Sequence, residues 1–265
     1  MTARAWTALP VAAALLAACG GSAMPESGVA SSSLCADSYL LTLAPERASM
    51  LSWQAGGRLS TASDAAARLP RLYPDRERLH ELDAVHIGGP APTTPPADVT
   101  LDWGEDFATV ARNAERVQAA VGGDERRLQA LLADIASLDA KTPDGPRPRI
   151  LYLSRAGGSA GAGTFVDAAI TAAGGENAAR APGWHTPSVE SVLSSDADLV
   201  LTSFFGSDYH GANDRARRHA AIGRFMADRP RIDVPGKLWP CAGPGLVEAT
   251  ALIRDGIADW SAARG

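Results

Sequence analysis

Short apolar runs alternate with stretches of helical periodicity along most of this chain. The runs AVHI (84–87), ILYLS (150–154) and LVLTS (199–203) are typical of strands that are buried on both faces of a parallel sheet. Between such runs, apolar residues recur every three or four positions, as they do on the buried face of a helix. This alternation predicts an α/β fold with parallel sheets.

The pattern starts twice, which predicts two α/β halves. We expect strands at 29–32, 48–53, 84–87, 99–101, 150–154, 199–203, 233–234 and 237–239. We expect helices at 36–43, 75–82, 106–121, 124–141, 165–173, 189–195, 212–227 and 246–263. The pair Gly122-Gly123 separates the two central helices, and the proline-rich segment 142–148 is a connector. Segments 77–88 and 190–202 both run from a glutamate through a helix and an aspartate into a buried strand, which supports the two halves.

The first 18 residues have the composition of a secretory signal. Arg4 supplies a positive charge, and the uncharged stretch 5–18 is shorter than the roughly 20 residues that a bilayer span needs. The ending LAAC (16–19) resembles a bacterial lipobox, in which cleavage leaves Cys19 first and its thiol takes a diacylglyceryl group. The alternative is an ordinary signal peptide with a chance cysteine. We expect 1–18 to be removed and the small, polar segment 19–28 to form a tether.

Composition and motifs argue against several classes of function. The net charge is −5 and the basic residues are dispersed, whereas a nucleic-acid footprint needs clustered Lys and Arg. A nucleophile elbow in strand-turn-helix context and a His-Glu-x-x-His motif are both missing from the sequence, so we expect no enzyme. The loop RAGGSAGAGT (155–164) lacks the Gly-Lys-Ser/Thr ending of a P-loop and is at best a weak anion site. Thr164 and Asp167 are expected to cap the helix that follows it.

Several segments together resemble the class III substrate-binding proteins of ABC importers, the group that captures cobalamin, ferric siderophores and haem. They are SSSLCADSYLLTLAP (31–45), ASMLSW (48–53), LDAVHIGG (82–89), AGAGTFVDAAITAAGGEN (160–177), VESVLSSDADLVL (189–201) and KLWPCAGPGLVEA (237–249). Their order and spacing cover nearly all of the mature chain. The chain departs from the family in its short N-terminal half and in the proline-rich segment 89–98, where relatives usually have a longer loop and helix.

The resemblance implies two Rossmann-like lobes with parallel sheets, joined by a long rigid helix. The N-terminal lobe would occupy 29–104, the helical connector 105–148 and the C-terminal lobe 149–265. The protein would be a monomeric, lipid-anchored periplasmic receptor that captures a metal chelate, a corrinoid or an iron-siderophore, in the interlobe cleft. It would deliver this ligand to an ABC permease and its ATPase. Iron or cobalt would arrive with the ligand, so no resident cofactor or metal site is expected.

Two other functions stay open. The first is a periplasmic metal or haem chaperone that works without a transporter. The second is a metalloenzyme on a nitrogenase-like fold, in which Cys35 and Cys241 would ligate a cofactor for chemistry.

Candidate ligand contacts follow from the implied two-lobed fold, because ligands of α/β sheets bind at the carboxyl ends of strands. The residues that follow the expected strands are Cys35, Ser52, Trp53, Gly89, Arg155, Phe204, Phe205, Trp239 and Cys241. Aromatic side chains suit a large planar ligand, although each tryptophan is also a candidate for the core. Arg155 is suited to clamp a carboxylate, or it is a solvated loop residue. His185 and His210 are weaker candidates for contact with a ligand or metal.

Glu77 and Glu190 occupy matching places in the internal similarity. Members of the family present one surface carboxylate from each lobe to arginines on the permease, and the resemblance assigns that role to these two residues. The alternative is that both are solvated helix residues.

If Cys19 carries the lipid, the two other cysteines of the chain are Cys35 and Cys241. An oxidising compartment favours a disulfide between an even pair, provided that the Cα atoms come within about 7 Å. The sequence leaves three states open: a bridge, two thiols that contact the ligand, and two independent buried cysteines.

Overall fold

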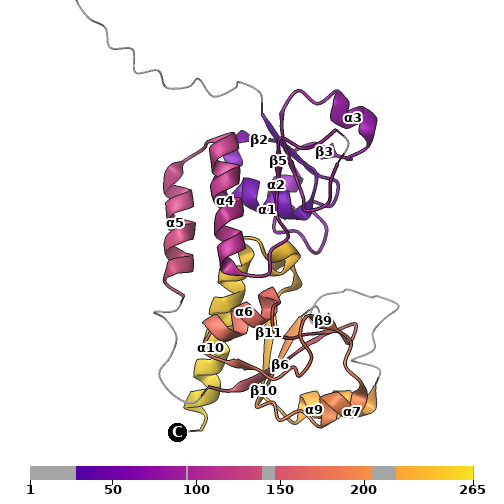
Figure 1. Ribbon diagram of the computed structural model, residues 1–265, viewed down its shortest axis with the longest axis vertical. Helices are drawn as coiled ribbons and strands as arrows, with labels where there is room; N and C mark the ends of the chain where they lie inside the picture. Colours follow the sequence, from indigo (N-terminus) through magenta and orange to yellow (C-terminus); the bar gives the residue numbers. More distant parts are fainter. Residues whose placement is uncertain (1–27, 94, 139–146, 204–218, 265) are drawn as a thin grey trace, which may run out of the picture.

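Two parallel sheets, one in each of two lobes, organise the structure (Figure 1). The computed structural model describes residues 28–93, 95–138, 147–203 and 219–264. The first lobe contains the N-terminal sheet, and the second lobe contains the C-terminal sheet with the final helix. The predicted α/β fold with two lobes is confirmed.

The first sheet has the strand order β3-β2-β1-β4-β5, and its neighbouring strands are parallel. Its strands are β1 (Val29–Ser31), β2 (Ala48–Ser52), β3 (Arg71–Leu72), β4 (Val85–Gly88) and β5 (Val99–Thr100). The chain forms β1, β2 and β3 in turn toward one edge of the sheet, and then crosses back to form β4 on the other side of β1. The strand order therefore reverses between β1 and β4, which is the switch point at which such sheets bind ligands.

The second sheet has the order β11-β10-β6-β8 and is also parallel. Its strands are β6 (Arg149–Ser154), β8 (Glu176–Asn177), β10 (Leu199–Ser203) and β11 (Arg231–Val234). All five residues of β10 are buried between its two neighbours, which explains its unbroken apolar run. Here the order reverses between β6 and β10. A short antiparallel ribbon of β7 (Ser159–Ala160) and β9 (Trp184–His185) lies beside the sheet.

Helices cover both faces of each sheet. They are α1 (Leu34–Leu43), α2 (Ser63–Ala66), α3 (Arg76–His80), α4 (Phe107–Val121), α5 (Glu125–Ala136), α6 (Phe165–Ala172), α7 (Val189–Leu193), α9 (Ala220–Ala227) and α10 (Gly245–Ala262). Short 3-10 turns are η1 (Pro45–Arg47), η3 (Gly236–Leu238) and η4 (Pro240–Ala242). In the first lobe α1 and α4 cover one face, while α3 packs Leu79 on the other. In the second lobe α6 and α10 lie opposite α7 and α9.

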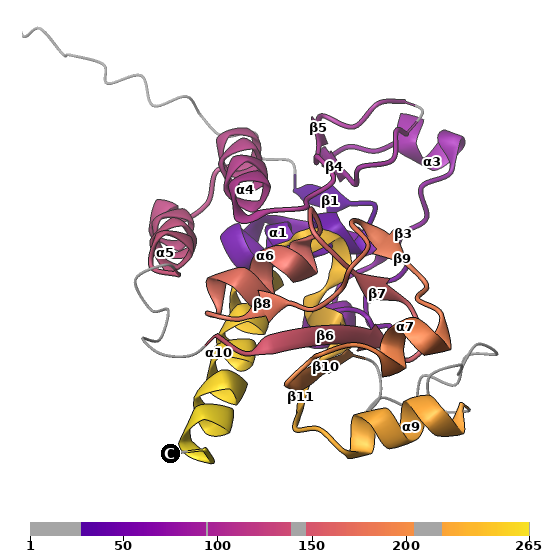
Figure 2. The same cartoon turned by 60° about the horizontal axis from the view of Figure 1, so that its bottom comes forward.

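The connector differs from the single long helix that the resemblance implied. Helices α4 and α5 lie side by side along the first lobe, and both contact α1 (Figures 1 and 2). Gly122 and Gly123 separate them as predicted, with φ of 69° and 107°, a region that favours glycine. A side chain at Gly123 would also collide with Ala44, since its Cβ would lie 2.8 Å from the Ala44 Cβ. The break at these glycines therefore folds the connector into a helical hairpin.

The strand expected at 237–239 is wrong, because this segment forms the 3-10 turns η3 and η4 instead. Pro235 precedes the first turn and Pro240 begins the second, and each proline fixes its own φ and lacks an N–H to donate to a neighbouring strand. The turns lead directly into α10, which buries Leu246, Ile253 and Ile257 at helical spacing.

The core runs without interruption from one lobe to the other. One cluster of buried side chains joins Tyr39 and Leu40 of α1 with Phe165 of α6 and Leu246 of α10. Because buried apolar surface contributes about 25 cal/mol per Å², this continuity opposes separation of the lobes.

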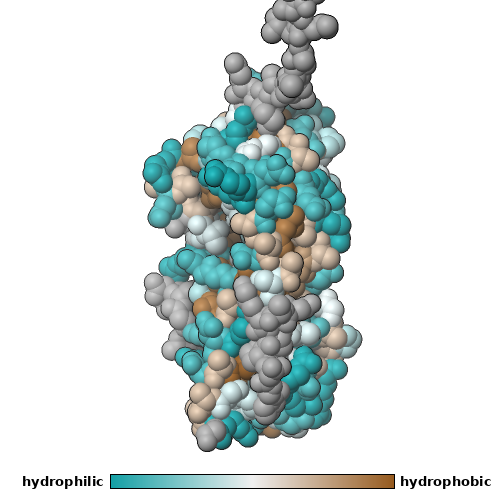
Figure 3. All heavy atoms as spheres, turned by 90° about the vertical axis from the view of Figure 1, so that its left-hand side faces the viewer, coloured by the Kyte–Doolittle hydropathy of each residue, from teal (hydrophilic) through white to brown (hydrophobic). Residues whose placement is uncertain are grey.

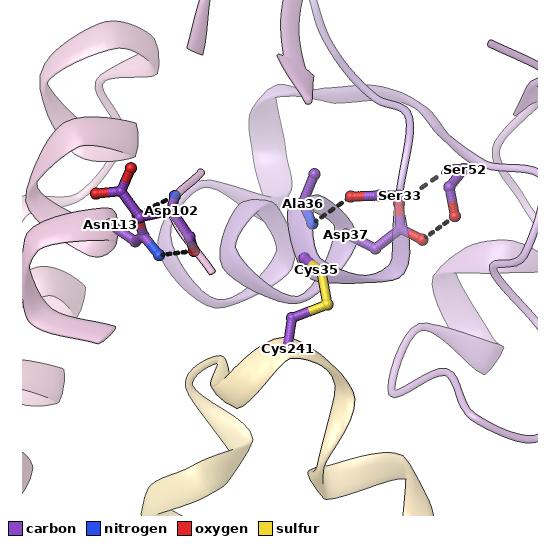
Figure 4. The surroundings of a disulfide bond; sticks show 8 residues. All are labelled: Ser33, Cys35, Ala36, Asp37, Ser52, Asp102, Asn113 and Cys241. Carbon is purple, nitrogen blue, oxygen red and sulfur yellow. Dashed lines mark hydrogen bonds between the residues drawn. A yellow bond between two sulfur atoms is a disulfide. The ribbon is translucent and has the colours of Figure 1, made fainter. Parts of the chain in front are cut away.

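A disulfide between Cys35 of α1 and Cys241 of η4 also joins the lobes, with 5.6 Å between the Cα atoms (Figure 4). Of the three states that the sequence left open, the structure has the bridge. Cys241 and Ala242 both have positive φ, 59° and 46°, which side chains other than glycine rarely adopt. The turn is thus held in an unfavourable backbone conformation by its covalent and packing partners.

The surface of the face that carries α4 and α5 is mostly hydrophilic, with hydrophobic residues in small separate patches (Figure 3). Within the described ranges, no helix has both the length and the apolar character that crossing a bilayer would require.

Replacing both bridged cysteines, Cys35→Ala with Cys241→Ala, should lower the free energy of unfolding by about 2–5 kcal/mol, because the bond closes a long loop in the unfolded chain. The loop spans 206 residues, so the effect should fall in the upper part of that range. Denaturant unfolding of the oxidised wild type and of the double variant measures it. Dithiothreitol is the control, since it should destabilise the wild type and leave the variant unchanged. Equal stability of the two oxidised proteins would contradict the prediction.

Candidate functional site

The carboxyl ends of the two sheets face each other across the lobe boundary. Cys35 follows β1 and is bonded to Cys241, which follows β11. Gly104 follows β5 and packs on the same turn, where an added Cβ would lie 3.1 Å from the Ala242 Cβ. Residues that follow strands therefore make contacts across the lobe boundary from both sides.

A hollow of about 450 Å³ lies at the switch point of the first lobe. Its lining follows strands β1, β3 and β4: Ser32, Ser33, Pro74, Arg76, Gly89, Pro90, Ala91, Pro92 and Thr93. Gly89 passes so close to β1 that a Cβ there would lie 2.7 Å from the Ser33 hydroxyl. The predicted site residue Gly89 therefore lines a real hollow, and so does much of the proline-rich segment.

His86 lies behind this hollow. Its Nε2 is 2.8 Å from the Ser32 hydroxyl, and its backbone N–H donates to Asp98 at 2.8 Å. Burial lowers the pKa of His86 from its ordinary value of 6.5, although nearby Asp98 opposes the shift. The imidazole is therefore uncharged at neutral pH and helps to fix Ser32.

A second hollow, of about 290 Å³, lies at the end of β6 in the second lobe. It is lined by Tyr152, Ser154, Gly158, Ser159, Trp184, His185 and Thr186. The Nδ1 of His185 is 3.1 Å from the carbonyl oxygen of Gly183. Because a carbonyl oxygen only accepts, Nδ1 is the donor in this hydrogen bond, and Nε2 takes no part in it.

Four aromatic side chains are about half exposed at the strand ends. Trp53 follows β2, Tyr73 follows β3, Trp103 follows β5, and Trp184 belongs to β9; their exposed fractions are 52%, 51%, 55% and 47%. Large aromatic side chains are usually more deeply buried than this. Exposed aromatic surface of this kind suits a large apolar ligand.

A buried carboxylate, Asp37, organises the interior beside β1 and β2 (Figure 4). It accepts the Ser52 N–H at 2.8 Å and the Ser52 hydroxyl at 2.5 Å, and Ser31 also donates to it. Burial raises the pKa of Asp37 even though these three hydrogen bonds favour the charged form. Ser52, a predicted ligand contact, is fully buried in this network and has no surface open to a ligand.

Most of the other predicted contacts also point inward. Cys35 and Cys241 are bonded to each other, so neither has a free thiol for a metal or ligand. Arg155 and Trp239 are only 4% and 5% exposed, and Trp239 packs between Tyr152 and Phe165 with ring centroids 6.1 Å and 5.8 Å apart. Arg155 and Trp239 therefore have little side-chain surface open to a ligand, and the two cysteines have no free thiol.

Trp53 is the predicted aromatic that stands exposed at a strand end. Phe204, Phe205, His210 and Cys19 lie outside the described residues. Glu77 and Glu190 are exposed and occupy the same position, the second residue of α3 and of α7.

The glycine-rich loop does not present its serine as an exposed nucleophile. Its segment GGSAG (157–161) matches the Gly-x-Ser-x-Gly pattern of a nucleophile elbow. However, Ser159 is buried in β7, and its hydroxyl donates a hydrogen bond to the Tyr152 carbonyl oxygen at 2.7 Å. Thr164 caps α6 as predicted, accepting the Asp167 N–H at 3.2 Å. The described residues contain no group of three or more His, Cys, Asp and Glu that could hold a metal ion.

Sequence reasoning missed Tyr73, Arg76, Trp103 and Trp184. Tyr73 and Arg76 follow β3, a two-residue strand that is too short to recognise by pattern. Trp103 follows a strand that was expected, and the same rule that selected Trp53 would have selected it.

No family model matches the chain, and no curated protein matches it. Solved structures do resemble it. The periplasmic heme-binding protein BhuT, in complex with two hemes, has a TM-score of 0.65 and 22% identity, over 88% of this chain and 97% of its own. The apo periplasmic heme-binding protein RhuT from Roseiflexus sp. RS-1 has a TM-score of 0.63 and 20% identity, over 87% and 98%.

The periplasmic heme-binding protein HutB of Vibrio cholerae has a TM-score of 0.67 and 19% identity, over 86% of this chain and 98% of its own. At these identities the likeness concerns the fold. This chain therefore shares the two-lobed fold of these three periplasmic heme-binding proteins.

Proposed function

We propose that this chain is the substrate-binding component of an ABC importer and captures haem, or a closely similar iron tetrapyrrole, between its lobes. The observation that carries the proposal is the set of half-exposed aromatic side chains: Trp53, Tyr73 and Trp103 follow strands of the first sheet, and Trp184 lines the hollow of the second lobe. Aromatic walls match the faces of a flat macrocycle. A ferric siderophore presents polar groups around its iron, and a corrinoid carries bulky side groups, so both fit such walls less well.

The polar groups at the site also suit haem. A tyrosine oxygen and a histidine nitrogen both serve as axial haem ligands, and Tyr73 in the first lobe and His185 in the second offer one of each. Arg76 lines the hollow of the first lobe and matches the carboxylates of a porphyrin. Three structures that share this fold are described as heme-binding proteins of the periplasm, which supports both the ligand class and the location.

Hemin should quench the tryptophan fluorescence of the ligand-free protein with a Kd below about 1 μM, which corresponds to roughly 8 kcal/mol. Cyanocobalamin and a ferric hydroxamate, titrated in parallel, should bind at least about tenfold more weakly. Tighter binding of either one would contradict the haem assignment, and no binding of any of the three would contradict the receptor role.

The two proposed axial ligands of the iron, Tyr73 and His185, are tested in the same titration. Tyr73→Phe and His185→Gln each remove one donor at nearly constant volume, so each variant that loses an axial ligand should change the Soret absorption. His219→Gln, at an exposed histidine before α9, is the matched control. Unchanged spectra in both site variants would exclude these residues as iron ligands.

The lipid anchor is a separate part of the proposal, and its residue, Cys19, lies outside the described residues. A diacylglyceryl group carries two acyl chains, enough for stable attachment, because each buried CH₂ contributes about 0.8 kcal/mol. Cys19→Ala should abolish incorporation of radioactive fatty acid and leave hemin binding unchanged, since Cys35 and Cys241 retain their bond. Undiminished label on the variant would exclude Cys19 as the lipidation site.

Permease docking through Glu77 and Glu190 completes the proposed importer role. Both carboxylates are exposed, and helices α3 and α7 that carry them lie on the same side of the molecule, one in each lobe (Figure 1). The backbone N–H of Glu190 and then the Ser188 hydroxyl hold the pKa of Glu190 below its ordinary value, so it is charged at neutral pH. The pair therefore presents two negative charges to a basic partner.

Charge reversal, Glu77→Lys with Glu190→Lys, should weaken association with the permease and its ATPase at least about tenfold while the Kd for hemin stays unchanged. Ligand-stimulated ATP hydrolysis in proteoliposomes measures the effect, which should shrink as salt screens it. Glu115→Lys with Glu125→Lys, on exposed residues of α4 and α5, is the control. Normal stimulation by the Glu77/Glu190 variant would exclude these docking residues, and no stimulation by the wild type would favour a chaperone.

A further inference from the structure

Glu105 connects three groups from both sides of the lobe boundary. Its Oε1 accepts the indole N–H of Trp103 at 2.6 Å and that of Trp184 at 3.4 Å. Its Oε2 accepts the backbone N–H of Phe165, the first residue of α6, at 3.1 Å. Trp103 and Glu105 precede helix α4, whereas Trp184 and Phe165 belong to the second lobe. One carboxylate thus holds an indole from each side.

The backbone that carries Glu105 is itself fixed. The side-chain amide of Asn113 in α4 makes two hydrogen bonds with Asp102, one to its N–H at 2.9 Å and one to its carbonyl at 3.0 Å (Figure 4). Gly104 packs on the bridged turn, where a Cβ would lie only 3.2 Å from the carbonyl oxygens of Cys241 and Ala242. The backbone at Glu105 therefore has little freedom to move.

The two indoles remain open to a ligand. Trp103 and Trp184 are about half exposed, and the N–H that each gives to Glu105 is the sole polar group of its side chain. Trp184 also packs on Phe165, with ring centroids 4.8 Å apart, and it lines the hollow of the second lobe. An exposed tryptophan without such a partner would sample several rotamers, and a ligand would have to order it on binding.

We propose that Glu105 is a positioning residue of the ligand site, which holds Trp103 and Trp184 at a fixed separation as aromatic walls for a planar macrocycle. This role rests on the proposed haem function. The carboxylate acts through the two indoles and has no contact with the iron. Its value for binding lies in preorganisation: the rotamers of two large side chains are ordered before the ligand arrives.

Two substitutions of graded severity test the role. Glu105→Gln keeps one acceptor oxygen, and Glu105→Met keeps the length of the side chain but has no oxygen. The Kd for hemin should rise about threefold in the first and about tenfold in the second, which matches the cost of ordering one or two side chains. Glu115→Gln, an exposed glutamate on α4, is the matched control and should bind as the wild type does.

A double-mutant cycle separates positioning from a general loss of stability. Trp184→Phe keeps an aromatic ring and removes the N–H, so it breaks the bond to Glu105 from the other side. If Glu105 acts through this indole, the Kd for hemin in the double variant Glu105→Met with Trp184→Phe should rise by less than the product of the two single fold-changes. Strictly multiplicative losses, or equal Kd values for Glu105→Met and the wild type, would overturn the proposal.

A ligand-free measurement keeps this test distinct from that of the proposed function. Acrylamide should quench the tryptophan emission of Glu105→Met more efficiently than that of the wild type, because freed indoles are more accessible, while the denaturation midpoint changes little. If hemin fails to bind the wild type, the haem proposal is wrong, and the quenching result still decides whether Glu105 positions the indoles. Equal quenching in the two proteins would overturn the positioning role whatever the ligand.

Discussion

The junction between α1 and the η4 turn fixes how the two lobes face each other. It combines the bond from Cys35 to Cys241 with close packing around two glycines. A Cβ on Gly243 would lie 2.7 Å from the Ser38 hydroxyl, and one on Gly104 would press on Ala242. Positive φ at two non-glycine residues of the turn costs roughly 1–3 kcal/mol each, so the turn keeps this shape because its surroundings enforce it. The distance between the two switch points, and with it the space for a ligand, follows from this junction.

The polar and aromatic residues near the strand ends have divided roles. Asp37 and Ser52 are polar yet buried, and their hydrogen bonds tie α1 to β2. Trp53 and Trp103 are apolar yet exposed. This is the reverse of the usual distribution, in which polar side chains are exposed and large apolar side chains are buried.

The sequence predicted the main strands and helices because their signals are local. The apolar runs of β6 and β10 and the caps Asp106, Asp124 and Thr164 act over a few residues, and each caps its helix in the structure. Strands β3, β7 and β9 have two residues each and owe their existence to pairing partners distant in sequence, so no local pattern reveals them. The segment 237–239 has the composition of a strand, but the prolines around it and the bridge at Cys241 impose turns.

The candidate site was predictable in position but less so in detail. The rule that ligands meet the carboxyl ends of strands points to the edge of each sheet where a hollow lies, and Gly89 lines the hollow of the first lobe while Trp53 is exposed after β2. The rule does not say which way a side chain points, because that depends on tertiary packing. Arg155 and Trp239 follow strands and yet turn inward, where the Trp239 ring fills the space between Tyr152 and Phe165. Tyr73 was missed because its strand was missed.

The long span of the disulfide also sets an order of events during biogenesis. Cys35 and Cys241 are separated by 206 residues, and synthesis delivers them in that sequence. Helix α1 and the strands beside it can assemble early, but the thiol of Cys35 must stay unpaired until nearly the whole second lobe has emerged. During that interval the thiol of Cys19 would be a competing partner, far closer along the chain than Cys241. Under the proposed lipid attachment, transfer of the diacylglyceryl group to Cys19 would remove this partner, so the timing of lipid attachment would be coupled to oxidative folding.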